Sequence, residues 1–272
     1  MCELLAISSR FPVTTNLSLM RFAEHGGHSG PHRDGWGIAY YHGNDIQRIR
    51  EPRAAADSDW VRFVANHHLS SSMLIAHLRS VTRGERNLAN TQPFTRELAG
   101  RMHLFAHNGD LPELFNLPRF KSSRYLPLGN TDSELVFCCL MDRLAAIWQN
   151  GYEPPPLTER LTIITELAKE IRSYGPANFL YSDGEYLFAH SHRRTNPVTK
   201  HIDAPGLHLL QRHCPATELN NTEIPGLLVN SNEQTLTLLA SVPLSDEPWQ
   251  PLDEGEIVVI KDGVVVTSSK NR

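Results

Sequence analysis

The residues that could do chemistry begin at the second position, where Cys2 directly follows the initiator methionine. The side chain of cysteine is small, so we expect Met1 to be removed, which would leave a thiol and a free α-amine on one residue. An α-amine has a pKa of about 8 and can act as a base toward the adjacent thiol. The alternative is that Cys2 stands there by chance and is buried at the start of a strand.

A second candidate is Asn108-Gly109, which follows the short apolar strand Met102–His107. Asn-Gly is a favoured pair in tight hairpin turns. The same pair could place an amide group and a backbone N–H side by side, as two neutral donors for a developing oxyanion. The dipeptide itself leaves both interpretations open.

Arg79 ends another apolar strand, Met73–Arg79, where a sheet would deliver its side chain into a cleft. A guanidinium there suits bidentate binding of a carboxylate, although a surface ion pair is the commoner fate of a single arginine. The glycine-rich loop before residue 37 contains His25, His28 and His32. These histidines lack carboxylate or cysteine partners at ligand spacing, so we predict no metal site and no cofactor.

The elements that must position these residues are mostly strands. Period-two patterns and turn signals predict strands at Cys2–Ser8, Gly35–His42, Gln47–Glu51, Met73–Arg79, Met102–His107, Ala177–Tyr181, Glu185–Ser191, Gly206–Arg212, Thr235–Ser241, Glu256–Ile260 and Val264–Ser268. Ser182-Asp183-Gly184 is typical of a hairpin turn. Strands at both ends, with long helices between them, favour antiparallel sheets covered by helices over a doubly wound parallel sheet.

Helices are predicted at Ser58–His68, Thr131–Trp148 and Leu157–Tyr174. Thr131-Asp132-Ser133-Glu134 has the pattern of a capping box, with Thr131 as N-cap. The helix behind it is apolar nearly all round and must be buried on both sides, so its two cysteines, Cys138 and Cys139, are expected to be core residues.

Composition excludes several classes of function. The 272 residues allow one large domain or two small ones, and we predict a single domain over residues 2–272. The net charge of −4 argues against a nucleic-acid surface, and no apolar stretch approaches a membrane span. The chain has no signal-peptide pattern, and its four cysteines lack metal-type spacing. We therefore expect a cytoplasmic protein with reduced thiols.

Together these motifs resemble the glutaminase domain of class II glutamine amidotransferases, which are N-terminal-nucleophile enzymes. The residues of the motifs are most similar to those of the YafJ-like branch. The resemblance spans nearly the whole chain. The motifs that carry it are Cys2, Asp34-Gly35-Trp36-Gly37, Arg79 with Thr82 and Gly84, Asn90-Thr91-Gln92-Pro93-Phe94, His107-Asn108-Gly109 and Thr131-Asp132-Ser133-Glu134.

The resemblance implies an α+β fold, a four-layer αββα sandwich of two antiparallel sheets between helix layers, as in Ntn hydrolases. It also implies a nucleophilic Cys2 with its α-amine as base, and an oxyanion hole formed by Asn108 and Gly109. Arg79 and Thr82 would bind the substrate, with Arg79 at the α-carboxylate of glutamine and Asp132 at its α-ammonium group. Two positions differ from synthase-type members, which usually have histidine at Arg83 and often at Gln92.

The function that this resemblance predicts is hydrolysis of the γ-amide of glutamine, or of a γ-glutamyl compound, through a thioester at Cys2. Three alternatives stay open: a glutaminase that passes ammonia to a separate synthase, a stand-alone γ-glutamyl amide hydrolase, and a catalytically silent glutamine-binding or regulatory protein. The presence of Cys2, Arg79, Asn108, Gly109 and Asp132 together argues against the silent protein. The chain ends where a synthase domain would begin, so we expect any acceptor site to lie on a separate protein.

Overall fold

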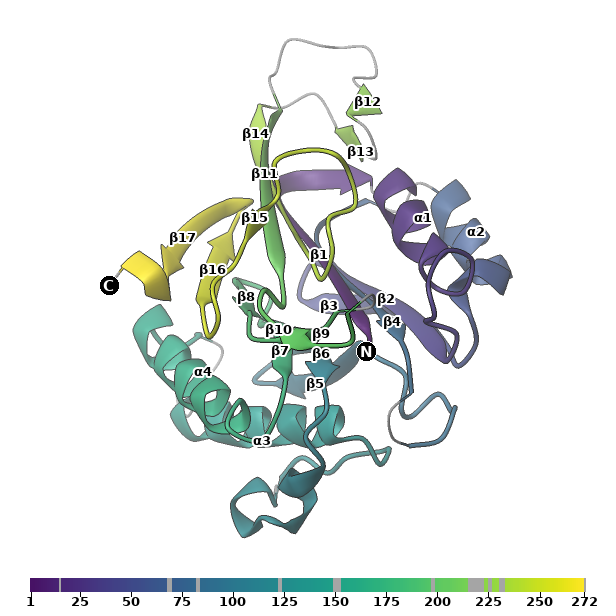
Figure 1. The fold of residues 1–272 in the computed structure, drawn as a ribbon. Coiled ribbons are helices and arrows are strands. Elements are labelled where there is room, and N and C mark those ends of the chain that lie inside the picture. Colours follow the sequence, from purple (N-terminus) through teal and green to yellow (C-terminus); the bar gives the residue numbers. More distant parts are fainter. Residues whose placement is uncertain are drawn as a thin grey trace.

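Two antiparallel sheets pack face to face, and helices cover their outer faces (Figure 1). The computed structural model describes residues 1–14, 16–67, 70–81, 84–121, 124–148, 153–196, 199–214, 223–224, 227–229 and 233–271. The prediction for Thr82 lies outside the described residues. Among the helices that are described, none has the length and apolar composition needed to cross a bilayer.

The first sheet has the strand order β15-β11-β14-β1-β4-β2-β3, and the short strands β12 and β13 join it beside β1. Its strands are β1 (Glu3–Thr14), β2 (Gly35–His42), β3 (Asp45–Glu51), β4 (Ser70–Arg79), β11 (His208–Cys214), β12 (Glu223–Ile224), β13 (Leu227–Val229), β14 (Gln234–Ala240) and β15 (Gln250–Pro251). β1 is central in this sheet, so the start of the chain lies between strands from both halves of the sequence.

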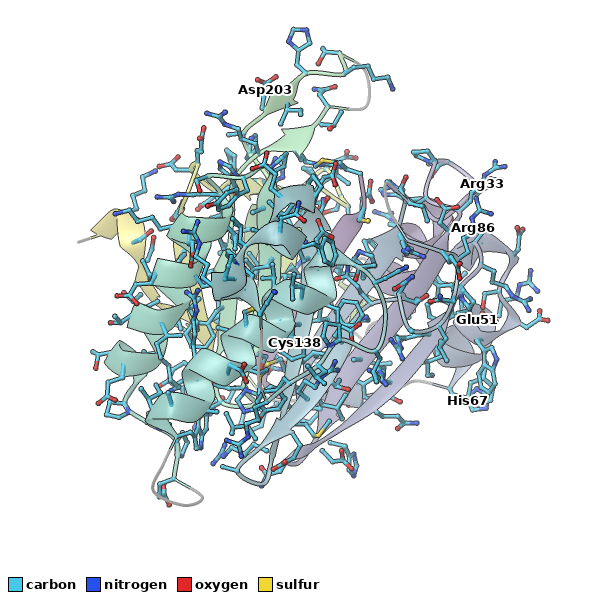
Figure 2. All side chains as sticks on the ribbon, turned by 90° about the horizontal axis from the view of Figure 1, so that it is seen from below. Arg33, Glu51, His67, Arg86, Cys138 and Asp203 are labelled. Carbon is cyan, nitrogen blue, oxygen red and sulfur yellow. The ribbon has the colours of Figure 1, made fainter. Side chains whose placement is uncertain are left out.

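The second sheet has the order β17-β16-β8-β7-β6-β5. Its strands are β5 (Phe94–Leu98), β6 (Arg101–Gly109), β7 (Ala177–Ser182), β8 (Leu187–His190), β16 (Ile257–Lys261) and β17 (Val264–Ser268). A separate hairpin of β9 (Arg194–Thr195) and β10 (Ile202–Asp203) lies beside the N-terminus in Figure 1. Figure 2 shows Asp203 of this hairpin projecting from the sandwich.

The helices form the two outer layers. They are α1 (Asn16–Glu24), α2 (Asp59–Asn66), α3 (Asp132–Ile147) and α4 (Leu157–Ile171), with short 3-10 turns η1 (Ala55–Asp57), η2 (Pro112–Asn116), η3 (Pro118–Phe120) and η4 (Ser269–Asn271). α1 and α2 cover the first sheet, and α3 and α4 cover the second. The predicted αββα sandwich is confirmed, and so are the three predicted helices, although α1 was not predicted.

Alternation along the strands explains the layers. In β1, Leu4 and Ala6 face the second sheet, whereas Leu5 and Ile7 face α1 and α2. The residues of α3 from Asp132 to Met141 are all buried, which confirms Cys138 and Cys139 as core residues. The apolar layer between the two sheets therefore sets the distance between them, and the two outer apolar layers attach the helices to the sheets.

The N-terminus of α3 forms only half of the predicted capping box. The Thr131 hydroxyl accepts a hydrogen bond from the Glu134 N–H at 3.3 Å. The Glu134 carboxylate does not accept a hydrogen bond from the Thr131 N–H. It accepts from the Gly129 N–H at 2.7 Å and pairs with Arg96 at 2.6 Å. The prediction of the reciprocal bond was wrong because a buried carboxylate gains more from a guanidinium than from one backbone N–H.

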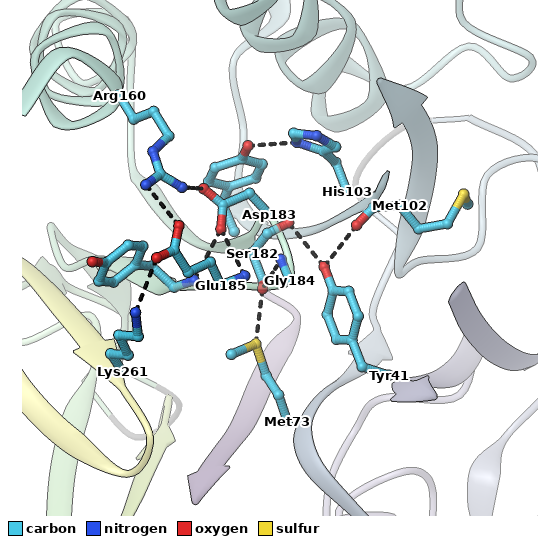
Figure 3. Close-up of polar contacts among 12 residues, drawn as sticks. Tyr41, Met73, Met102, His103, Arg160, Ser182, Asp183, Gly184, Glu185 and Lys261 are labelled. Carbon is cyan, nitrogen blue, oxygen red and sulfur yellow. Dashed lines mark hydrogen bonds and ion pairs between the residues drawn. The ribbon is translucent and has the colours of Figure 1, made fainter. Parts of the chain in front are cut away.

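A buried ion pair ties α4 to the turn between β7 and β8 (Figure 3). Arg160 lies 2.6 Å from Asp183, which is fully buried, and 2.9 Å from Glu185. Asp183 also accepts from the N–H groups of Glu185 and Tyr186, at 3.0 and 2.9 Å. Ser182-Asp183-Gly184 thus forms the predicted turn, and the Asp183 carboxylate in it is paired with Arg160 of helix α4.

We expect Arg160→Met to lower the free energy of unfolding by about 3 kcal/mol, because it leaves the Asp183 carboxylate buried and uncompensated. The measurement is urea denaturation at neutral pH. Lys261→Met is the matched control: Lys261 pairs with Glu185 in the same network but is 38% exposed, so its loss should cost less than about 1 kcal/mol. Equal effects of the two changes would contradict this account.

Candidate active site

Residues from both sheets meet at the start of β1. Cys2 immediately precedes β1, and Arg79 ends β4, whose Leu78 is paired with Glu3. Asn108 and Gly109 end β6 in the second sheet, and the Asn108 Nδ2 atom donates to the Cys2 carbonyl oxygen at 2.7 Å. The structure thus brings four of the sequence-predicted residues to one end of the space between the sheets.

The Cys2 thiol is partly buried and contacts the backbone of the residue that follows Arg79. The Sγ atom lies 3.5 Å from the Ser80 carbonyl oxygen and accepts from the Ser80 N–H at 3.4 Å. Burial raises the pKa of the Cys2 thiol, and the Ser80 hydrogen bond and the charges of the N-terminus and Arg79 only partly oppose that rise. The thiol is therefore protonated at neutral pH and needs a base before it can act as a nucleophile.

Asn108 and Gly109 lie in a strand and not in a hairpin turn. Asn108 is paired with Asn178 and Gly109 with Ala177 across the β6–β7 ladder. A Cβ atom at Gly109 would lie 2.0 Å from the Pro176 carbonyl oxygen, so only glycine fits there. The close approach of two strands, and not a turn, therefore explains the glycine.

The backbone of β6 sets the direction of the Gly109 N–H. The Asp110 N–H donates to Pro176 at 3.3 Å, toward β7. Residues in an antiparallel ladder bond alternately to either side, so Gly109 and His107 bond toward the opposite edge. There the side chain of Gln92 binds His107, and the pairing with β5 begins only at Phe94 opposite Phe105. The Gly109 N–H therefore points to an edge of β6 that strand pairing does not reach.

Arg79 is buried, with only 4% of its surface exposed, so it is not the surface arginine of the alternative interpretation. It donates to the Glu85 carbonyl oxygen at 2.9 Å. Burial lowers the pKa of Arg79, and the nearby groups of Cys2 and Asp34 oppose that shift. The Asp34 carboxylate accepts from the Val81 N–H at 2.7 Å, which fixes the turn after β4.

The loop after β4 is joined to the segment before α3 through Asn90. The Asn90 side chain donates to Glu85 at 3.1 Å and to Asn130 at 2.7 Å, and it accepts from the Asn130 N–H at 2.9 Å. These bonds hold the loop that contacts Arg79 close to the N-terminus of α3, where Asp132 stands.

Asp132 is buried in the first turn of α3, and its charge raises the pKa of the Cys2 thiol, which places the two groups within electrostatic reach of each other. Its two carboxylate oxygens accept from the Leu111 N–H at 2.5 Å and from the Ser133 N–H at 2.8 Å. A carboxylate is favourable at a helix N-terminus in any case. The geometry is compatible both with a structural role at that terminus and with a cation-binding role.

Two of the three loop histidines bind a carboxylate that sequence reasoning did not single out. His25 and His32 lie 2.8 and 3.0 Å from the two oxygens of Glu3, on the face of β1 opposite to Cys2. Burial alone would raise the pKa of Glu3, but these hydrogen bonds outweigh it and lower the pKa to about 2. Within the described ranges, no group of three histidine, cysteine or acidic side chains has the geometry to hold a metal ion.

Two buried amides contact the end of β6: sequence reasoning named Gln92 only as part of a motif, without this contact, and missed Asn178. An asparagine within the apolar strand 177–181 was the available signal, because asparagine is depleted in strands. A groove of about 910 Å³ lies elsewhere, between the last turn of α4 and the segment 192–193. Cys2, Arg79 and Asp132 do not line this groove.

Comparisons with known proteins agree with this arrangement. The family model of class II glutamine amidotransferases matches residues 1–272. The chain is 34% identical over 261 residues to YafJ of Escherichia coli strain K12, which bears the name of a glutamine amidotransferase; the match covers 94% of this chain and 96% of YafJ.

Solved structures are similar as well. One is the crystal structure of a Pseudomonas aeruginosa protein that is described as a predicted glutamine amidotransferase. Its sequence is 31% identical and its TM-score is 0.67, and the match covers 98% of this chain and all of that one. The phosphoribosylpyrophosphate amidotransferase of B. subtilis has a TM-score of 0.60 at 14% identity, covering 98% of this chain and 49% of that one, which shows a shared fold. The family model over residues 1–272 and the 34% identity to YafJ together establish that this chain belongs to the class II glutamine amidotransferases.

Proposed function

We propose that this protein hydrolyses the γ-amide of glutamine, or of a γ-glutamyl compound, through a thioester at Cys2. The observation that carries the proposal is the 2.7 Å contact between the Asn108 side-chain amide and the Cys2 carbonyl oxygen. It brings an amide donor of the second sheet to the thiol-bearing residue of the first. The Gly109 N–H, at the unpaired edge of the same strand, is a second donor beside it.

The reaction begins from a chain that has lost Met1, so that the α-amine of Cys2 is free. The amine takes the thiol proton, and the thiolate attacks the γ-carbonyl carbon. Asn108 Nδ2 and the Gly109 N–H stabilise the oxyanion. The amine returns the proton to the leaving nitrogen, ammonia or an amine departs, and water then hydrolyses the thioester. The raised pKa of the Cys2 thiol supports this need for an adjacent base.

Arg79 and Asp132 are proposed to hold the two charged ends of the γ-glutamyl group. A buried guanidinium at the end of β4 suits the α-carboxylate, and the Asp132 carboxylate suits the α-ammonium group. Asn90 supports this assignment, because it joins the loop beside Arg79 to the segment that precedes Asp132. A role for Thr82 in substrate binding remains a prediction from the sequence.

We expect Arg79→Ala to raise the KM for glutamine roughly 10- to 100-fold, which corresponds to the loss of one charge-assisted hydrogen-bonded contact. Steady-state kinetics on glutamine measures it. The matched control is Arg86→Ala: Arg86 pairs with Asp34 beside the same loop but is 64% exposed and lies at the periphery in Figure 2. An unchanged KM in Arg79→Ala would exclude the carboxylate role.

Residues 2–272 are proposed to act as one domain. The support is the strand order, because β1 pairs with β14 in the first sheet and β6 pairs with β7 in the second. Each sheet therefore needs strands from both halves of the chain. The four cysteines are all free, which supports a reducing compartment such as the cytoplasm.

The experiment that tests the proposed function is glutamate release from glutamine and from γ-glutamyl amides of increasing size, with intact mass recorded for the same sample. Hydrolysis by the isolated, Met1-free chain would support a stand-alone hydrolase. Hydrolysis that needs an added synthase would support a glutaminase subunit. A Met1-free chain that releases no glutamate from any of these substrates and forms no adduct with diazo-oxo-norleucine, an electrophilic glutamine analogue, would contradict the proposal.

A further inference from the structure

Two side-chain amides hold the end of β6 from opposite edges. On one edge, Gln92 accepts from the His107 N–H at 2.6 Å and donates to the His107 carbonyl oxygen at 3.1 Å. On the other edge, Asn178 donates to the Asn108 carbonyl oxygen at 3.1 Å. Both amides are buried. Successive residues of β6 are therefore fixed by side chains at the position where strand pairing on one side stops.

Gln92 takes the place of a strand residue. The last pair of the β5–β6 ladder is Phe94 with Phe105, and the next hydrogen-bonding position on that edge of β6 is His107. The Gln92 amide supplies the donor and the acceptor that a backbone would supply there. Because a side chain satisfies His107 and the β5–β6 ladder ends at Phe105, the following N–H on this edge, that of Gly109, lies beyond the reach of that ladder.

Asn178 fixes the other edge and is itself immobilised. Besides Asn108, it binds the Arg193 carbonyl oxygen and the His192 N–H, each at 2.7 Å. The α-carbon of Gly206 packs directly against its amide, since a Cβ atom there would lie 1.6 Å from Oδ1. The amide therefore cannot turn without breaking three hydrogen bonds or moving the backbone of a neighbouring segment.

We propose that Gln92 and Asn178 are positioning residues, together called the β6 clamp, that orient the Asn108 amide and the Gly109 N–H toward the reacting carbonyl. This inference rests on the proposed function. The clamp does not touch the reacting atoms and acts through the backbone of residues 107–109. A displacement of about 1 Å from residues remote from the chemistry can cost roughly 10²-fold in rate.

The test compares Gln92→Met and Asn178→Ala with the wild-type chain, each free of Met1. Each change is expected to lower kcat roughly 10- to 100-fold and to leave KM nearly unchanged, because the γ-glutamyl contacts at Arg79 and Asp132 remain. The rate at which iodoacetamide alkylates Cys2 should also stay unchanged, since direct displacement at its methylene carbon develops no oxyanion at Asn108. A purely structural loss would lower kcat and would also change the alkylation rate, because the burial that raises the pKa of the Cys2 thiol would be altered.

Ser191→Ala is the matched control for Asn178→Ala. The Ser191 hydroxyl accepts from the N–H groups of Gly206 and Leu207, at 3.3 and 3.1 Å, so it holds the same segment without touching β6. Its kcat should remain close to the wild-type value. If Ser191→Ala loses as much activity as Asn178→Ala, or if both clamp variants keep full kcat, the inference is overturned.

Hydrogen exchange separates failure of the clamp from failure of the proposed function. Backbone exchange in a peptide that covers residues 105–110 should be faster in both clamp variants and unchanged in Ser191→Ala, whether or not the chain hydrolyses glutamine. Unchanged exchange in the clamp variants would overturn the inference by itself. If Asn178→Ala does not fold, Asn178→Asp replaces it, because it keeps the acceptor for the His192 N–H and loses the donor to Asn108.

Discussion

Replacement of Cys2 by alanine is expected to abolish hydrolysis of glutamine and of γ-glutamyl amides, because no other thiol can form the thioester. Cys139 and Cys214 are buried in the cores on the outer faces of the two sheets, and Cys138 is buried against Arg96. Burial also raises the pKa of Cys138 to about 11 and that of Cys139 to about 12, so neither is a thiolate at neutral pH. The measurement is ammonia release, with intact mass after treatment with diazo-oxo-norleucine.

Wild-type protein should carry one adduct, Cys2→Ala should carry none, and Cys138→Ala should behave like the wild type. Removal of Met1 must be confirmed for each sample, because a retained methionine blocks the α-amine that serves as the base. Alanine at position 2 is small and should permit the same processing. An adduct or residual turnover in Cys2→Ala would place the nucleophile elsewhere and contradict the proposed mechanism.

Replacement of Asn108 by alanine is expected to lower kcat by roughly 10²- to 10³-fold, the usual effect of losing one oxyanion donor. KM should change little, because Arg79 and Asp132 would still hold the γ-glutamyl group. Steady-state kinetics on the Met1-free chain measures both constants. Asn108→Asp is the companion variant: it keeps the shape of the side chain but has no donor at neutral pH, so it should lose as much activity. Near-normal turnover in either variant would remove Asn108 from the oxyanion hole.

Much of the fold could be predicted from the sequence because its signals are local. Strand periodicity and the Thr131 cap depend on residues within a few positions of each other, and both were confirmed. α1 was not predicted because it spans only nine residues, too few for a strong helical pattern. The hairpin interpretation of Asn108-Gly109 was wrong because the close approach of Pro176, far away in the sequence, decides the backbone there.

The supporting residues of the candidate site could not be predicted in the same way. Asn178 is 70 residues from Asn108, and only the register of β6 with β7 brings the two together. Gln92 lies in a motif that the sequence does reveal, but its two bonds to His107 depend on where β5 begins. The sequence therefore indicates which residue types are present, while the sheet register determines which of them meet.

The nucleophile and the proposed oxyanion donors belong to different sheets, so the thickness of the apolar layer between the sheets sets their separation. Small side chains fill part of that layer: Ala6, Ala39, Ala106 and Ala189. A methyl group added to one of these alanines would push the sheets apart and increase the distance between the Cys2 thiol and the Asn108 amide. Such substitutions should therefore lower the rate of turnover before they measurably lower the stability of the fold.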